Sequence, residues 1–420
     1  MAVNGESSTL ALEARVDAGP SEYRFRTAGG VCSPDRFRTA ELLLADVLWD
    51  AADRDGATGR RDVGAPVVDS ALVPEANYGV VGTLAAPVLD RVAMTESSAR
   101  AARLCEANAA RHGVDAAVSL TAGVNALEPK EGVADLPRGD VGVSSTSGAG
   151  SATSFDAVAY APKPYTPLDV GAQRLVDATS RLDRGGRVFV AAAERAGLAR
   201  YERVLADRCD GGRVDCVAER DDVRVLRGVV CDAGSEESAA EHVSIREFSA
   251  SVGGLEVALA SVPGVFSATR LDDGTRLLAA AAEVEDGDRV LDLCCGYGAL
   301  GAWAAQAADC SVCLSDDDRV ATACAERTLR RNGVDGTVVT ADGVTAVSDR
   351  AFDRVLCNPP THATDRLLAD LFEDVGGVLA PDGDLFVVHH ADLDLRPQLR
   401  SFDDVATAET GEAHVVLRAA

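Results

Sequence analysis

The sequence Val290-Leu-Asp-Leu-Cys-Cys-Gly-Tyr-Gly298 joins a short apolar strand to a helix through a turn that is rich in glycine. Glycine at positions 296 and 298 lets the backbone approach a ligand, because no Cβ stands in the way. The first turn of the helix that follows offers unpaired N–H groups. A strand, a turn and a helix in this order predict a doubly wound, mainly parallel sheet, and such sheets bind ligands at the carboxyl ends of their strands.

Strands and helices alternate around this stretch. We expect strands at 289–293, 311–315, 337–340 and 352–357, and helices at 299–308 and 319–331. The second of these strands leads to Asp316, 18 residues after Gly298, which is placed to accept hydrogen bonds from both hydroxyls of a ribose. Asp316 is also suited to cap the next helix, a role that Asp317 or Asp318 can take instead.

Other strand ends also carry polar residues. Asp292 is placed to accept a hydrogen bond from a ligand, and Asp342 is placed either to contact an adenine amino group or to lie in a solvated loop. Asn358-Pro-Pro360 follows the fourth strand, and its two prolines hold the Asn358 amide and the adjacent carbonyl in fixed directions. Two such oxygens can bind an –NH2 group by its hydrogens and leave the nitrogen lone pair free, which predicts chemistry at an amine.

The chain contains two copies of one pattern. The matching pairs, in chain order, are Gly30–Ser33 with Gly264–Ser267, Thr95–Asp115 with Ser315–Asp335, and Leu182–Phe189 with Leu379–Phe386. We therefore expect one domain over 1–235 and a second over 236–420, with the boundary in the polar stretch 232–241 and an insertion at 128–154.

The first copy is expected to lack the chemistry. Val67-Val-Asp69 resembles the end of its first strand, and no compact glycine turn follows it. Ala161 stands at the position of Asn358, 197 residues earlier. The first domain is therefore predicted to be a degenerate copy of the second.

Composition limits the classes of function. The chain has 41 basic and 67 acidic residues, a net charge of −26, and its only lysines are Lys130 and Lys163. Such a surface suits a salt-rich cytosol, in which charges are strongly screened. No apolar run approaches ~20 residues, and Met1 to Ser8 lack the basic-then-apolar pattern of a signal peptide. We therefore expect a cytoplasmic protein, as a monomer, without a membrane segment.

The charge is divided unevenly along the chain. Residues 236–420 hold 33 acidic and 14 basic residues, a net charge of −19, whereas residues 1–235 hold 34 and 27. The nearly balanced first domain, with Arg-bearing segments at 23–38 and 195–208, is therefore expected to provide a surface that binds the phosphates of a partner. Cys310-x-x-Cys313 has no partner residues with metal-ligand spacing, and we expect buried thiols and no metal.

The strand ends together resemble the S-adenosylmethionine pocket of class I amino-methyltransferases. Pro263–Leu278, which contains Pro-Gly-Val-Phe-Ser and Leu-Asp-Asp-Gly-Thr, resembles a motif of the "small domain" ribosomal-RNA guanine-N2 methyltransferases. The resemblance implies an α/β fold of two tandem Rossmann-like methyltransferase domains, the N-terminal one degenerate. It also implies S-adenosylmethionine as cofactor, and methylation of the exocyclic N2 amine of a guanine in ribosomal RNA or a ribosomal subunit.

The same resemblance assigns roles to residues. It implies Asn358, Pro359 and Pro360 as catalytic. The cofactor-binding residues implied are Asp292, Cys295, Gly296, Gly298, Asp316, Asp342, Asn358, Gly274 and Thr275. Thr361, His362 and Lys163 are the implied substrate contacts.

Two departures from the family pattern keep other functions open. Cys294 replaces a glycine, and Thr361 replaces the aromatic residue that usually follows Asn-Pro-Pro. One alternative is transfer to another acceptor: a protein glutamine, DNA adenine or a small amine. The other is a non-catalytic RNA-binding assembly factor with a decayed pocket.

Overall fold

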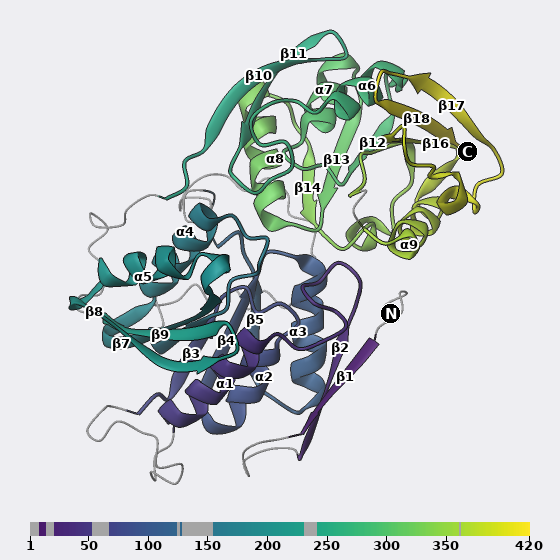
Figure 1. Cartoon of the computed structure of the whole chain (residues 1–420). Coiled ribbons are helices and arrows are strands. Elements are labelled where there is room, and N and C mark those ends of the chain that lie inside the picture. The colour runs from purple at the N-terminus through teal and green to yellow at the C-terminus, as the bar shows by residue number, and fades with distance from the viewer. Residues whose placement is uncertain are drawn as a thin grey trace. The chain divides into compact units, whose positions relative to one another are not determined.

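The computed structural model describes residues 8–13, 21–52, 67–123, 127, 154–230, 242–360 and 363–420 (Figure 1). Apart from Leu127, the described residues up to Val243 form a first compact unit, and those from Ser244 onward form a second. The predicted boundary at 232–241 and nearly all of the predicted insertion at 128–154 lie outside the described residues. No described helix is long and apolar enough to cross a membrane.

The second unit is built on a seven-stranded sheet in the order β14-β13-β12-β15-β16-β18-β17. Its strands are β12 (Arg289–Leu293), β13 (Ser311–Asp316), β14 (Thr337–Thr340), β15 (Phe352–Cys357), β16 (Leu379–His390), β17 (Val405–Thr410) and β18 (His414–Ala419). All neighbouring strands from β14 to β16 are parallel, and β18 pairs antiparallel with both β16 and β17. The carboxyl ends of β12, β13, β14 and β15 therefore meet along one edge.

Helices cover this sheet. They are α6 (Asp273–Ala281), α7 (Ala299–Ala307), α8 (Arg319–Asn332) and α9 (Asp365–Gly376), and a hairpin of β10 (Arg246–Val252) and β11 (Leu255–Ser261) packs against α7 and α8. The alanine-rich α7 packs closely against β13. A Cβ added to Gly301 of α7 would come within 2.6 Å of the Leu314 side chain. Leu291 and Val355 lie in the core on the opposite face, together with Phe372 of α9.

The first unit repeats this topology. Its sheet has the order β5-β4-β3-β6-β7-β9-β8, which matches the second sheet strand for strand. The strands are β3 (Ser70–Val73), β4 (Arg91–Glu96), β5 (Ala116–Leu120), β6 (Phe155–Tyr160), β7 (Leu182–Ala193), β8 (Cys209–Arg220) and β9 (Val223–Val230), with a separate pair β1 (Ser8–Glu13) and β2 (Glu22–Thr27). The helices are α1 (Thr39–Ala52), α2 (Val80–Ala85), α3 (Ala99–Arg111), α4 (Leu168–Thr179) and α5 (Leu198–Ala206). The predicted duplication is confirmed.

One expectation about the first unit is wrong. Its first central strand is β3, which begins after Asp69 rather than ending there, and the turn that follows has the backbone of the glycine turn in the second unit. Three left-handed residues correspond in pairs: Glu75 (φ 48°) with Cys294 (58°), Asn77 (60°) with Gly296 (54°), and Gly79 (86°) with Gly298 (80°). Because Glu75 and Asn77 occupy two of the left-handed positions, a glycine pattern does not identify this turn in the sequence.

Candidate functional site

The Asn358 amide lies at the end of β15 in a fixed orientation. Its Nδ2 donates to the hydroxyl of Thr275 (2.9 Å) and to Oδ2 of Asp272 (3.2 Å). Within the described residues its oxygen accepts no hydrogen bond. Because both contacts take up the nitrogen, the amide presents its oxygen as an acceptor for a ligand.

Asp272 was not found by the sequence analysis. It is the N-cap of α6, and its Oδ2 also accepts from the backbone N–H of Thr275 (2.9 Å). The available signal was an Asp in the Leu-Asp-Asp-Gly-Thr motif, at the position where a helix begins. One carboxylate therefore joins the start of α6 to the end of β15.

Gly274 and Thr275, which the resemblance placed beside the cofactor, support this amide. The Thr275 side chain is buried and its hydroxyl contacts Asn358. A Cβ added to Gly274 would lie 2.9 Å from the Asp272 carboxylate and 3.0 Å from the ring of His414. Glycine at this position therefore permits close packing of α6.

Asp316 presents a carboxylate at the end of β13. Its Oδ2 accepts from the backbone N–H of Gly296 (2.9 Å), and its Oδ1 accepts from that of Asp318 (2.9 Å). Burial raises the pKa of Asp316 to about 7, although these two N–H groups act to lower it. Asp318 is the N-cap of α8. The capping role therefore falls to Asp318.

Two of the predicted ligand positions line this edge. A Cβ added to Gly296 would meet nothing within 4 Å, so the space above the turn is open. The backbone N–H of Ala341 donates to the carbonyl of Asp316 (2.8 Å), which holds the end of β14 and therefore Asp342 beside Asp316.

Three other predicted residues lie within the protein instead. Asp292 is 1% exposed, and its carboxylate accepts from the backbone N–H of Gly301 (2.8 Å) in α7, while burial raises its pKa. A Cβ on Gly298 would lie 2.9 Å from Ala325 and Leu314. Cys295 is buried. These residues position α7 and the turn rather than face an open space.

Thr361 and His362 lie outside the described residues. Cys294 takes φ 58°, a left-handed conformation, and hydrogen-bonds the thiol of Cys357. Cys313 is buried as expected, whereas Cys310 is only half-buried. No group of three His, Cys, Asp or Glu side chains in the described ranges could hold a metal ion.

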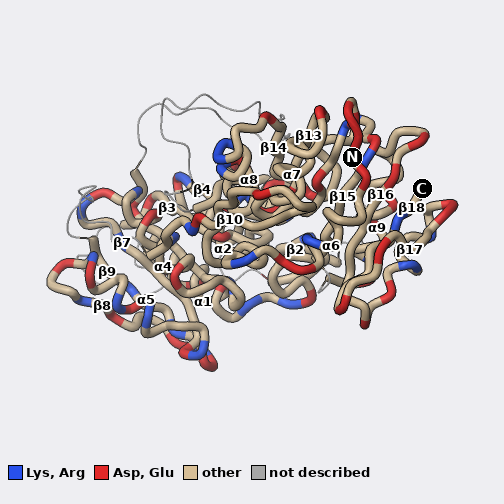
Figure 2. Tube along the Cα trace, turned by 90° about the horizontal axis from the view of Figure 1, so that it is seen from above, with Lys and Arg blue, Asp and Glu red and all other residues tan. Residues whose placement is uncertain are grey.

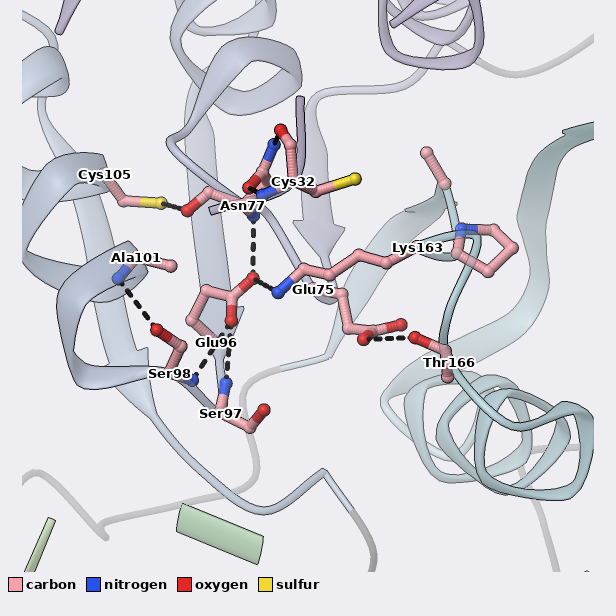
Figure 3. Close-up of polar contacts among 12 residues, drawn as sticks. Cys32, Glu75, Asn77, Glu96, Ser97, Ser98, Ala101, Cys105, Lys163 and Thr166 are labelled. Atoms are coloured by element: carbon pink, nitrogen blue, oxygen red, sulfur yellow. Dashed lines mark hydrogen bonds and ion pairs between the residues drawn. The ribbon is translucent and has the colours of Figure 1, made fainter. Parts of the chain in front are cut away.

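The first unit fills the equivalent site with its own side chains (Figure 3). Glu96 ends β4 as Asp316 ends β13, and its Oε1 accepts from the backbone N–H of Asn77 (2.8 Å). The Lys163 ammonium lies 2.6 Å from the same oxygen. Lys163 is 7% exposed, and the charges of Glu96 and Glu75 outweigh burial and raise its pKa. Lys163 is thus an internal ion-pair partner, where the sequence predicted a substrate contact.

Other contacts complete the filled site. Glu75 pairs with Arg174 and accepts from the hydroxyls of Tyr160 (2.6 Å) and Thr166 (3.0 Å). Arg38, at the position of Asp272, donates to the carbonyl of Ala161 (3.2 Å). The first unit keeps the backbone arrangement of the second site. Its side chains at the positions equivalent to the expected ligand contacts bind one another or the backbone instead.

The second site fits a nucleoside cofactor. A partly desolvated carboxylate such as Asp316 gains from the two hydroxyl donors of a ribose, and the open face of Gly296 leaves room beside it. The fold and these groups define a class I S-adenosylmethionine-dependent methyltransferase.

Comparisons with known proteins agree. A family model described as "Methyltransferase small domain" matches residues 256–418. The "Ribosomal RNA small subunit methyltransferase C" of Pseudomonas aeruginosa (strain LESB58) is 31% identical over 255 residues, 57% of this chain and 71% of the relative. The protein of the same name from Actinobacillus succinogenes is 38% identical over 138 residues, 32% of this chain and 41% of the relative. The chain belongs to this small-domain methyltransferase family.

A solved structure supports the tandem fold. A T. thermophilus 16S rRNA N2 methyltransferase, in complex with AdoMet and guanosine, superposes with a TM-score of 0.70 at 23% identity and covers 98% of this chain and 97% of its own. The predicted fold class, family, cofactor and enzyme class are therefore confirmed.

Proposed function

We propose that this enzyme transfers a methyl group from S-adenosylmethionine to the exocyclic N2 amine of a guanine in the ribosomal RNA of the small subunit. The oriented Asn358 amide carries the proposal, because it presents an acceptor oxygen at the strand edge where the cofactor fits. The names of the relatives and the guanosine in the similar solved structure support the choice of acceptor.

The site works by orientation. The bound cofactor supplies a methyl group on a positively charged sulfur. The Asn358 oxygen and the carbonyl of Pro359 would each accept one hydrogen of the amine, which directs the nitrogen lone pair toward that methyl group. Asp272 and Thr275 prevent the amide from rotating. No strong base is needed beforehand, because the proton leaves after the new N–C bond forms.

The remaining contacts follow from position. Asp316 would bind the ribose hydroxyls and Asp342 the adenine amino group, because both stand at adjacent strand ends. Gly296 would let the cofactor lie against the turn. His362 and Thr361 remain candidate contacts to the base.

We assign RNA docking to the first unit, and propose that the enzyme acts as a cytoplasmic monomer. Basic and acidic residues are interspersed along α5 and β8, and β9 adds only arginines (Figure 2). Arg195, just before α5, forms an exposed ion pair with Asp222, just before β9. Exposed pairs contribute only about 0–1 kcal/mol, so a phosphate can replace the carboxylate at little cost.

The test is methyl transfer to small-subunit RNA that lacks the mark, with nucleosides identified by mass spectrometry. Asn358→Ala should reduce transfer about 100-fold or more, within the range of one positioned catalytic group, and leave cofactor affinity unchanged. Asn332→Ala is the matched control: its amide joins α8 to β11, and its loss should lower stability but not turnover. Full activity of Asn358→Ala would refute the mechanism, and a methylated amine other than guanine N2 would favour another acceptor.

A further inference from the structure

We propose that Phe266 supplies the aromatic face on which the acceptor guanine stacks, an inference that rests on the proposed function. The ring is 64% exposed. Among the described residues of the second unit, it is the only Phe, Tyr or Trp classed as exposed. An exposed ring gives up the stabilisation that burial would bring and is free to contact a ligand.

The turn that carries Phe266 is rigid. The backbone N–H of Val265 donates to the carbonyl of Val262 (3.3 Å), and the Ser267 hydroxyl donates to the carbonyl of Arg270 (2.8 Å). Ser267 takes φ 50°. The Tyr297 hydroxyl also donates to the Arg270 carbonyl, at 3.3 Å. The ring is thus presented on a fixed support beside the glycine turn.

The first unit shows that the turn does not itself require an exposed ring. The matching residue there is Cys32, in a turn whose Ser33 takes φ 53°. Cys32 is 5% exposed. The same backbone therefore holds a buried small residue in the unit whose site is filled and an exposed aromatic in the unit with the catalytic site.

The first unit also locates this position relative to the site. The Cys32 N–H donates to Oδ1 of Asn77 (3.0 Å), and its carbonyl accepts from Nδ2 of the same amide (2.9 Å) (Figure 3). Asn77 corresponds to Gly296, so one amide side chain spans the gap between the two turns. In the second unit a Cβ added to Gly296 would meet nothing within 4 Å, and the correspondence between the units places Phe266 across this open gap.

The same contacts lead on toward the acceptor site. The backbone N–H of Asn77 donates to Oε1 of Glu96 (2.8 Å), and the Lys163 ammonium lies 2.6 Å from that oxygen. Lys163 stands 197 residues before Pro360, at the matching position. By this correspondence, Phe266 in the second unit lies near the Asn-Pro-Pro segment.

The chemistry requires such a face. An amine edge directed at Asn358 leaves the two faces of the base to be bound, and the threonine after Asn-Pro-Pro offers no π surface. Stacking of a base on an aromatic ring contributes about 1–3 kcal/mol, a factor of about 5 to 150 in affinity.

The test compares Phe266→Leu, Phe266→Trp and, as a control, Leu393→Ala, which removes another exposed apolar side chain of the second unit. At saturating cofactor, Phe266→Leu should lower kcat/KM for RNA about 5- to 150-fold, with cofactor affinity unchanged. Phe266→Trp should retain activity, and guanosine should quench its additional fluorescence. Leu393→Ala should match the wild type.

Wild-type kcat/KM in Phe266→Leu, or absence of quenching in Phe266→Trp, would overturn the inference. Inactivity of the wild type toward the RNA would instead refute the proposed function, and the quenching experiment would still decide whether Phe266 stacks on guanine.

Discussion

Cofactor affinity should depend on pH through Asp316. The ionised carboxylate is a stronger acceptor for the two ribose hydroxyls than the protonated acid, so binding favours the form without the proton. With a pKa of about 7, about a tenth of the groups are ionised at pH 6 and about nine tenths at pH 8. The affinity for S-adenosylmethionine should therefore rise by up to about tenfold from pH 6 to pH 8, and level off above that.

Calorimetry at constant high salt measures this dependence. Asp316→Asn should bind more weakly and lose the dependence on pH, because no proton can then be displaced. Asp353→Asn is the matched control, since Arg289 holds the pKa of Asp353 at about 2 and that group does not titrate in this range. Equal affinity of the wild-type enzyme at pH 6 and pH 8 would refute the reasoning.

Three other changes test the packing of the two units. Cys294→Gly should stabilise the chain by about 1 kcal/mol in denaturant unfolding, because φ 58° suits glycine; destabilisation would mean that the contact with Cys357 outweighs the strain. Lys163→Met should lower the free energy of unfolding by about 3–5 kcal/mol, because the buried Glu96 carboxylate then lacks its ion-pair partner. Arg195→Ala, at an exposed position, should change the free energy of unfolding little. Thr275→Val should slow methyl transfer about tenfold with cofactor affinity unchanged, and an unaltered rate would show that Asp272 alone orients Asn358.

The sequence predicted most of the catalytic fold because strand ends and turns carry local signals. The predicted strands at 289–293, 337–340 and 352–357 have the observed bounds, since Gly, Asn or Pro follows each short apolar run within three residues. The turn of the first unit escaped because its left-handed positions are held by Glu75 and Asn77, which neighbouring side chains support. Such support is a long-range property that local residue types do not reveal.

The site was predicted less completely, for a similar reason. Asn358 and Asp316 stand where the strand spacing placed them. Asp272 contacts a residue 86 positions away, and nothing in its local sequence indicates that contact. Gly298 was predicted to contact the cofactor. A Cβ at this position would instead meet Leu314 of β13 and Ala325 of α8, which are distant in the sequence.

The burial of Lys163 has a practical consequence. Arginine supplies 39 of the 41 basic residues of the chain, so reagents that acylate primary amines have few targets. The amine of Lys163 is enclosed with Glu96, and a reagent can reach it only when the first unit opens. The rate of acylation at this one residue, followed by peptide mass, would therefore report how often the first unit opens, separately from the second.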